Sequence, residues 1–357
     1  MRPTHRLVTY DLSTLTNRFR GKSFCGAKTF ASEVGRTLRL LGAIISQNAR
    51  TTDTAKSPTT IAALQEAVFP LSDPELASNG QAVSSVWIMD NDSRTDINRT
   101  MAVSSAWNGT EWSQPQTIND DGTADFHPQL LLSADDAMLC AWEDQKIVLN
   151  DSDDFETMVA NMEISVARYN PGSGQWEGAQ RLTDNNYLDR SPAISGSGGQ
   201  NDEALLTWIS NESNDLIGSS ATPNTLRFSR FDGQTWATPD TAIEIPYPLI
   251  KYDTIFESSS GKGLVVMSLD IDDDLSTIAD RQLFTLTYQN GSWGSLTQLT
   301  TDDLPDDNPQ LALDPSGNVV LVWLKDSELS SLSATSFTLP EMTERQIILS
   351  DESGYSN

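Results

Sequence analysis

The sequence contains few residues of the kinds that build metal centres and nucleophilic catalysts. Its 357 residues include only two cysteines, Cys25 and Cys140, and two histidines, His5 and His127. This scarcity argues against a zinc site, whose ligands come from clustered Cys and His. It also argues against Cys–His or Ser–His catalysis, unless His127 alone is the base. We expect His127 to be a surface loop residue, and Cys140, in the apolar run MLCAW, to be a small buried hydrophobe.

The chain also lacks an apolar run long enough to span a bilayer. The longest candidate, LRLLGAII, lies within residues 32–46, which suit a short amphipathic helix, and Arg39 interrupts it. Residues 1–65 carry ten Lys/Arg and three Asp/Glu and do not share the pattern of the rest. Three interpretations stay open for this segment: a basic leader and linker that is disordered or partly helical, a signal sequence behind a misassigned start codon, or a small helical domain.

Positive charge is scarce in the remainder of the chain. Residues 66–357 carry thirteen Lys/Arg against forty-seven Asp/Glu, and the whole chain has a net charge of −27. A surface of this sign repels phosphate groups, so we expect no nucleic-acid partner. The acidity suits a secreted or cell-surface protein, and it attracts cations and basic partners.

A repeat organises this acidic part of the chain. A turn containing glycine is followed by a tryptophan four times, at intervals of 57–64 residues, and these residues are Trp112, Trp176, Trp236 and Trp293. A second tryptophan closes an apolar strand at Trp87, Trp142, Trp208 and Trp323, and Met267 holds this place in the fourth repeat. A repeat of this length holds four short strands, which is the size of a propeller blade.

The pattern therefore predicts an all-β fold, a β-propeller of four-stranded blades over residues 66–357. Asn-Gly and Asp-Gly between strands predict type I′ hairpins, in which both central residues have positive φ. Five blades are recognisable, at about residues 69–119, 120–184, 185–245, 246–303 and 304–349. The last residues resemble the linkers between blades. We therefore expect a five-bladed ring, an incomplete ring or a fragment, as a monomer or as part of a larger chain.

The repeats resemble a known family. The runs SAWNGTEWSQPQTINDDG and LTYQNGSWGSLTQLTTDD, followed by HPQL and NPQL, are similar to the degenerate Asp-box blades of secreted sialidase-like propeller proteins of bacteria and archaea. The resemblance covers about Phe69 to Leu349 and implies the fold. The Ser-x-Asp-x-Gly-x-x-Trp turn of true sialidases is missing, since Asp314-Pro-Ser-Gly317 has no following Trp. No arginine pattern suggests the carboxylate-binding cluster that those enzymes use.

The acidic loops that follow the second strand of each blade are candidates for metal binding. In a propeller these loops gather on one face, and carboxylates are the hard donors that Ca²⁺ prefers. None of the loops has the EF-hand spacing, so solvated polar loops are the alternative interpretation. The candidate ligands are Asp90, Asp92, Asp270, Asp272 and Asp274.

The four repeated tryptophans after the turns are candidates for ligand binding. If they are exposed, Trp112, Trp176, Trp236 and Trp293 can stack on sugar rings; if they are buried, they pin each outer strand to the next blade. No catalytic set emerges from the sequence. The prediction is a non-catalytic extracellular binding or scaffolding propeller with a glycan or protein ligand. No cofactor is certain from the sequence, and Ca²⁺ is the candidate. The alternative is a sialidase-like glycoside hydrolase.

Overall fold

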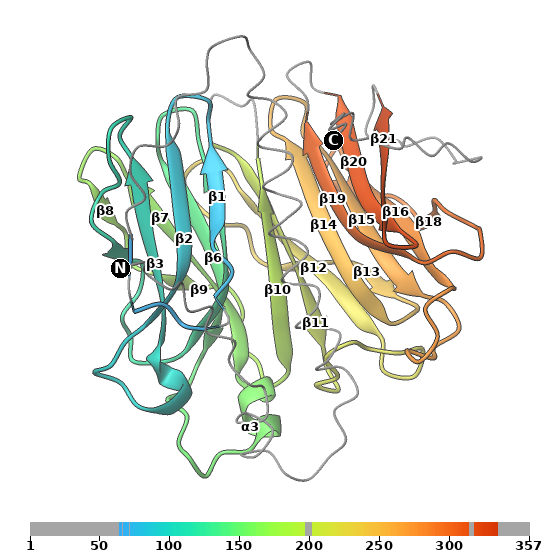
Figure 1. Ribbon diagram of the computed structural model, residues 1–357, viewed down its shortest axis with the longest axis horizontal. Helices are drawn as coiled ribbons and strands as arrows, with labels where there is room; N and C mark the ends of the chain where they lie inside the picture. Colours follow the sequence, from blue (N-terminus) through green and yellow to red (C-terminus); the bar gives the residue numbers. More distant parts are fainter. Residues whose placement is uncertain (1–63, 66, 71, 197–201, 314–317, 335–357) are drawn as a thin grey trace, which may run out of the picture. The chain divides into compact units, whose positions relative to one another are not determined.

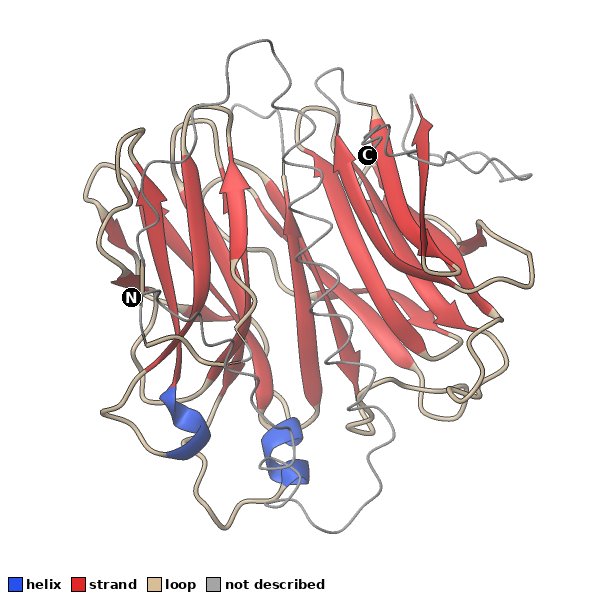
Figure 2. Ribbon diagram, in the orientation of Figure 1, coloured by secondary structure: helices blue, strands red, loops and turns tan. Residues whose placement is uncertain are grey.

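The chain is all-β in its described part. The structure is a computed structural model that describes residues 64–65, 67–70, 72–196, 202–313 and 318–334. Within them, five antiparallel sheets follow one another along the chain, and helical structure is confined to two short segments (Figures 1 and 2). No described helix is both long and apolar enough to cross a membrane. The expected leader, Cys25, the turn at 314–317 and the end of the fifth expected blade, residues 335–349, lie outside the described residues.

Each sheet is a meander of consecutive strands. The first contains β1 (Glu75–Ser78), β2 (Val83–Asp90), β3 (Thr100–Trp107) and β4 (Gln116–Thr117). The second contains β5 (Asp125–Leu132), β6 (Met138–Gln145), β7 (Met162–Asn170) and β8 (Gln175–Trp176), with β9 (Gln180–Arg181) also paired to β7. The third contains β10 (Leu188–Ser195), β11 (Ala204–Asn211), β12 (Asn224–Phe231) and β13 (Asp240–Ile245).

The last two sheets vary this plan. The fourth contains β14 (Leu249–Glu257), β15 (Lys262–Asp270), β16 (Arg281–Gln289) and β17 (Ser292–Trp293), with β18 (Thr297–Gln298) also paired to β16. The fifth contains β19 (Asp306–Leu313), β20 (Val319–Lys325) and β21 (Glu328–Ala334). The helical segments η1 (Asp96–Arg99) and α3 (Phe155–Ala160) follow β2 and β6. The prediction of a β-propeller with five recognisable blades is confirmed.

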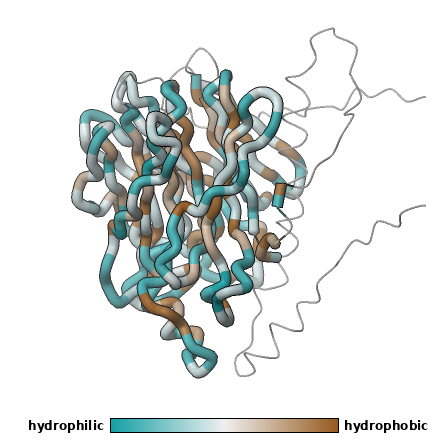
Figure 3. Tube along the Cα trace, turned by 90° about the vertical axis from the view of Figure 1, so that its left-hand side faces the viewer, coloured by the Kyte–Doolittle hydropathy of each residue, from teal (hydrophilic) through white to brown (hydrophobic). Residues whose placement is uncertain are grey.

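Apolar layers join each sheet to the next one in the chain. Val86 and Ile88 of the first sheet pack with Cys140 and Trp142 of the second, and similar clusters join every later pair of neighbouring sheets. Cys140 is fully buried, as expected for a small hydrophobe. Hydrophobic residues run along the strands, while hydrophilic residues dominate many of the loops (Figure 3). Burial of apolar faces between neighbouring blades is therefore what stacks the repeats.

The first strands of successive sheets contact one another. Contacts join β1 to β5, β5 to β10, β10 to β14 and β14 to β19. In three of these strands the residue before the proline has positive φ, with values of 44° at His127, 53° at Ser191 and 52° at Asn308. Each lies at a β-bulge, where the pairing with the second strand shifts register. The bulges change the direction of side chains on strands that meet at the centre of the propeller.

A buried Asp–Trp hydrogen bond recurs beside these bulges. The indole Nε1 atoms of Trp142, Trp208 and Trp323 donate to Asp125, Asp189 and Asp306 over 2.9, 3.0 and 2.7 Å. In the fourth sheet the pairing register puts Leu249 and Met267 at the same two positions, and both are buried. The aspartate and the tryptophan are thus replaced together by apolar residues, which avoids a buried polar group without a partner.

The hairpin turns correct one detail of the prediction. Of the predicted Asn-Gly and Asp-Gly turns, only Asn290-Gly291 has positive φ at both central residues, as a type I′ turn requires. In the turns at Asn108-Gly109 and Asp232-Gly233 the strands pair across four residues, and only the glycine has positive φ. There the side chains of Asn108 and Asp232 each accept two backbone N–H bonds. This side-chain cap makes a second left-handed residue unnecessary.

Candidate functional site

The loops between the second and third strands come together in four consecutive blades, and we call them the loop face: residues 91–99, 146–161, 212–223 and 271–280. The two helical segments of Figure 2 belong to it. Neighbouring loops are hydrogen-bonded to each other. The Asn98 side chain exchanges two bonds with the Leu149 backbone, and Ser220 Oγ donates to Asp273 Oδ2 over 2.8 Å. These bonds join the first loop to the second and the third to the fourth, and the gathering of the loops on one face agrees with the sequence-based prediction.

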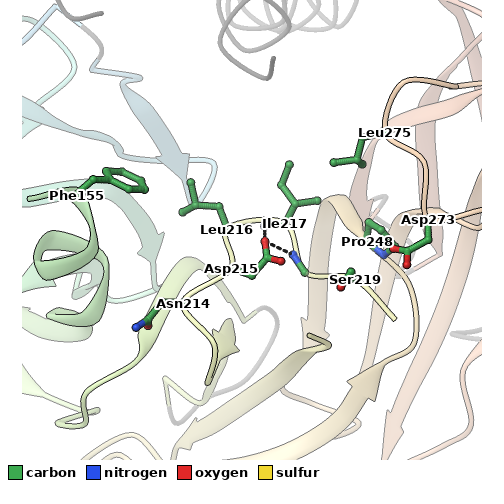
Figure 4. A pocket seen from close by; sticks show the side chains of 10 residues that line it. Phe155, Asn214, Asp215, Leu216, Ile217, Ser219, Pro248, Asp273 and Leu275 are labelled. Carbon is green, nitrogen blue, oxygen red and sulfur yellow. Dashed lines mark hydrogen bonds between the residues drawn. The ribbon is translucent and has the colours of Figure 1, made fainter. Parts of the chain in front are cut away.

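A pocket of about 440 Å³ opens in the loop face. Three blades line it with apolar side chains: Phe155 of α3, Leu216 and Ile217 of the third blade, and Leu275 of the fourth (Figure 4). Asp215 also lines the pocket, and its carboxylate accepts the Ile217 N–H over 3.1 Å. Leu216 and Leu275 are 38% and 43% exposed. The pocket therefore presents apolar side chains to solvent.

Exposed apolar residues concentrate on the loop face. Of the eight large hydrophobic residues that are exposed in the described part of the chain, five lie in these loops: Ile147, Val148, Leu216, Leu275 and Ile278. The same four loops carry twelve Asp/Glu and three Lys/Arg. Each of the three cations is already paired, Arg94 with Asp120, Arg99 with Asp90, and Lys146 with Glu163. The surface is therefore both apolar and acidic.

The predicted metal ligands fall into two groups. Asp90 and Asp92 both bind the Arg99 guanidinium. Asp270 and Asp272 do lie together, but their third neighbour is Asp280 rather than Asp274. Asp274 instead accepts the Ser276 N–H and hydroxyl within its own turn. Asp280 was not among the ligands predicted from the sequence, because this residue lies at the far end of the loop, beside β16.

The four predicted ligand tryptophans are all half-buried and pair with aromatic rings. Their partners are Trp107 for Trp112, Tyr169 for Trp176, Phe231 for Trp236 and Tyr288 for Trp293, with ring centroids 4.8–5.8 Å apart. Trp176 also donates from Nε1 to Ser104 Oγ of the preceding blade. This packing favours the interpretation that they pin the outer strands, and their ligand binding stays a prediction.

The structure also reveals a polar cluster on the inner strands that sequence reasoning missed. His127, expected in a surface loop, lies on β5 with its Nδ1 2.8 Å from Glu143 Oε2. Glu143 is 5% exposed, and its other oxygen accepts the Ser191 N–H over 2.6 Å. The Glu143 charge raises the pKa of His127. Burial alone would raise the pKa of Glu143, but the charge of His127 and its hydrogen bond hold that pKa below its usual value.

The third and fourth blades extend this cluster. Arg190 donates to Ser191 Oγ over 2.8 Å, while its Nε has no hydrogen-bond partner among the described residues. Burial lowers the pKa of Arg190, and the charges of Glu143 and Asp215 oppose that shift. The hydroxyl of Tyr252 donates to the backbone oxygens of Ser191 and Thr207, 2.5 and 3.1 Å away.

Two carboxyl groups of the inner strands have raised pKa values. Burial raises the pKa of Glu75 on β1, and the charge of Asp253 adds to the shift. Burial raises the pKa of Asp253 on β14 to about 6, although its carboxylate accepts the N–H groups of Leu311 and Thr254. The Lys251 charge opposes both shifts. Donors and acceptors of several blades thus converge at the inner strands.

The raised pKa of Asp253 predicts a pH effect on stability. Between about pH 4 and 6 the folded state binds the proton of the Asp253 carboxyl group more tightly than the unfolded state does. The contribution of Asp253 to the free energy of unfolding therefore falls as pH rises through that window. The loss is on the order of 1–3 kcal/mol. Urea unfolding of the wild type and of Asp253→Asn from pH 4.5 to 7.5 measures it. We expect a flatter pH dependence for the variant, and parallel curves would contradict the assignment.

Comparisons with known proteins show similarity of fold alone. Neither a protein-family model nor a curated protein matches this chain. A protein of unknown function from Dyadobacter fermentans is 15% identical, with a TM-score of 0.49, over 77% of this chain and 83% of that one. The GH93 alpha-L-arabinofuranosidase of Fusarium graminearum is 13% identical, with a TM-score of 0.48, over 73% and 76%.

A sialidase is also among the similar structures. The Trypanosoma rangeli sialidase is 8% identical, with a TM-score of 0.42, over 73% of this chain and 46% of that one. At such identities and TM-scores these similarities say nothing about activity.

Proposed function

We propose that this protein is a secreted or cell-surface propeller that binds a protein partner, without catalysis, through the loop face. The observation that carries the proposal is the pocket that Phe155, Leu216 and Leu275 line from three different blades. Exposed apolar side chains that gather in one place are typical of interaction sites. The partner we propose is a segment with apolar side chains and flanking Lys or Arg.

The charge of the loop face supports this choice of partner. Its excess of carboxylates steers basic partners toward it and repels acidic ones. Its few cations are engaged in ion pairs, so they offer little to an anionic ligand. The bonds between neighbouring loops favour a preformed surface, which lowers the ordering cost of binding.

A displayed library of random peptides, selected on the whole chain, tests the proposal. We expect enriched peptides that combine apolar residues with Lys or Arg and that lose affinity as salt rises. The double variant Leu216→Ser/Leu275→Ser should bind them about tenfold more weakly or worse, because two anchor contacts are lost.

The matched control for this experiment is Leu76→Ser, which changes an exposed leucine of β1 outside the loop face. It should bind like the wild type. Acidic or purely polar enriched peptides, equal binding by the double variant, or no enrichment at all would refute the proposal.

The inner-strand cluster favours a second candidate, a polar ligand such as a glycan. The cationic side chains of Arg190, His127 and Lys251 stand beside several carboxylates. If the glycan is a substrate, the reaction is glycoside hydrolysis, in which one carboxyl group with a raised pKa acts as the acid. Glycan arrays and a panel of glycosides, probed with the wild type and with Arg190→Gln, separate this candidate from the first.

A further inference from the structure

Three carboxylates meet where the β15–β16 loop leaves and re-enters the fourth sheet. One oxygen each from Asp270, Asp272 and Asp280 lies within 4.8 Å of the others. Asp270 ends β15, and Asp280 immediately precedes β16. The group therefore stands on the ends of two paired strands, which hold two of its three members in place.

Asp270 is the unusual member of the group. Its side chain is fully buried, and neither carboxylate oxygen has a hydrogen-bond partner among the described residues. Arg281 Nε is 3.7 Å from Asp270 Oδ2, too far for a hydrogen bond, and Arg281 Nη1 lies nearer to Asp307, at 3.2 Å. A buried carboxylate without hydrogen bonds is costly, so an additional ligand for it is expected.

Local hydrogen bonds bring the other two carboxylates to Asp270. The Asp272 N–H donates to Asp280 Oδ2 over 2.8 Å, and Thr277 Oγ1 donates to Asp272 Oδ2 over 3.1 Å. Asp272 is exposed and Asp280 half-buried, so water reaches the group from one side. Hydrogen bonds within the β15–β16 loop thus hold carboxylate oxygens of Asp272 and Asp280 close to the buried carboxylate of Asp270.

We infer that Asp270, Asp272 and Asp280 bind a divalent cation, and that this cation is Ca²⁺. Ca²⁺ takes 6–8 oxygen ligands at about 2.3–2.6 Å and accepts irregular geometry, so three carboxylates and water can complete its shell. Mg²⁺ keeps several waters and is usually held by one or two carboxylates in near-octahedral geometry, which suits this group less well. The site does not depend on the proposed partner binding.

Calorimetric titration of Ca²⁺ into the EDTA-treated whole chain tests the site. Asp280→Asn and Asp270→Asn should each remove one binding event or weaken it on the order of tenfold or more, because a charged ligand is lost. Asp274→Asn is the matched control, since it removes one charge from the same loop and its amide oxygen can still accept from Ser276. It should bind Ca²⁺ like the wild type.

A thermal shift checks the same site independently. Ca²⁺ should raise the unfolding midpoint of the wild type by a few degrees, and the same concentration of Mg²⁺ should do so much less. Asp280→Asn, whose fold circular dichroism monitors, should lose this difference. Unchanged Ca²⁺ binding in both Asp280→Asn and Asp270→Asn overturns the inference, and so does an equal loss in Asp274→Asn.

Discussion

Trp208→Ala is expected to lower the free energy of unfolding by about 3–5 kcal/mol, the range for a fully buried aromatic side chain. Trp208 is 0% exposed and packs with Leu206, Ile164 and Val166 between the second and third sheets. Its loss opens a cavity between two blades and takes one donor from the buried carboxylate of Asp189. Urea denaturation at pH 7, followed by tryptophan fluorescence and circular dichroism, measures the change.

A double-mutant cycle separates packing from the hydrogen bond. Asp189→Leu alone leaves the donors of Trp208, Ser210 and Asn185 without their acceptor, which we expect to cost about 2–4 kcal/mol. Asp189→Leu/Trp208→Met copies the pair found at Leu249 and Met267. It should cost less than the sum of Asp189→Leu and Trp208→Met made singly, by about 1–3 kcal/mol.

This cycle has a clear contrary result. Additive costs would mean that the Asp–Trp bond contributes nothing beyond the separate packing of the two side chains. The joint replacement in the fourth blade would then need another explanation.

Glu143→Ala is expected to cost about 2–4 kcal/mol, because it removes one partner of a buried ion pair. His127 would lose its anion, and the Ser191 N–H at the bulge of β10 would lose its acceptor. The expected loss is moderated because the His127 side chain is 54% exposed, so water can solvate part of its charge. Urea unfolding of the variant and the wild type gives the difference.

The pH dependence identifies the ion pair as the cause. The pKa of Glu143 is lowered, so its contribution is present above its unfolded pKa and is lost as pH falls through the folded value. The pKa of His127 is raised, so its contribution is complete below about pH 6.5 and is lost as pH rises through the folded value. The difference in the free energy of unfolding between the wild type and Glu143→Ala should therefore be largest between about pH 4.5 and 6.5.

His127→Gln is the control for this dependence. In the protein that carries His127→Gln, the free-energy cost of Glu143→Ala should no longer decline above pH 6.5. The Ser191 N–H stays bonded to Glu143 in that protein. A difference between wild type and Glu143→Ala that does not change with pH would exclude an ion pair and leave only the lost hydrogen bond.

The fold was open to prediction because its signals are local and repeated. Alternating apolar residues, a glycine turn and a closing tryptophan such as Trp142 or Trp208 recur at similar intervals along the chain. Each blade must bury both of its faces against neighbours, so one pattern repeated five times specifies one architecture. The burial of Cys140 followed from its apolar strand in the same way.

Site residues were harder to predict because they come from different blades. Asp274 belongs to the same run of aspartates as Asp272, yet the turn directs it to Ser276, and Asp280 arrives from the other end of the loop. His127 looked like a loop residue because nothing nearby in the chain marks Glu143 as its partner. Such pairings depend on strand register, which the chain encodes only through its complete packing.

The amino-acid sequence alone was enough for the class of fold, the number of recognisable blades, the acidity of the surface and the gathering of acidic loops on one face. The pocket between Phe155, Leu216 and Leu275, the His127–Glu143 pair and the Asp270–Asp280 group required the tertiary structure. The physical reason is that hydrophobic periodicity acts within a single strand, whereas these groups are assembled from residues that only bulges, loop contacts and blade-to-blade packing bring together.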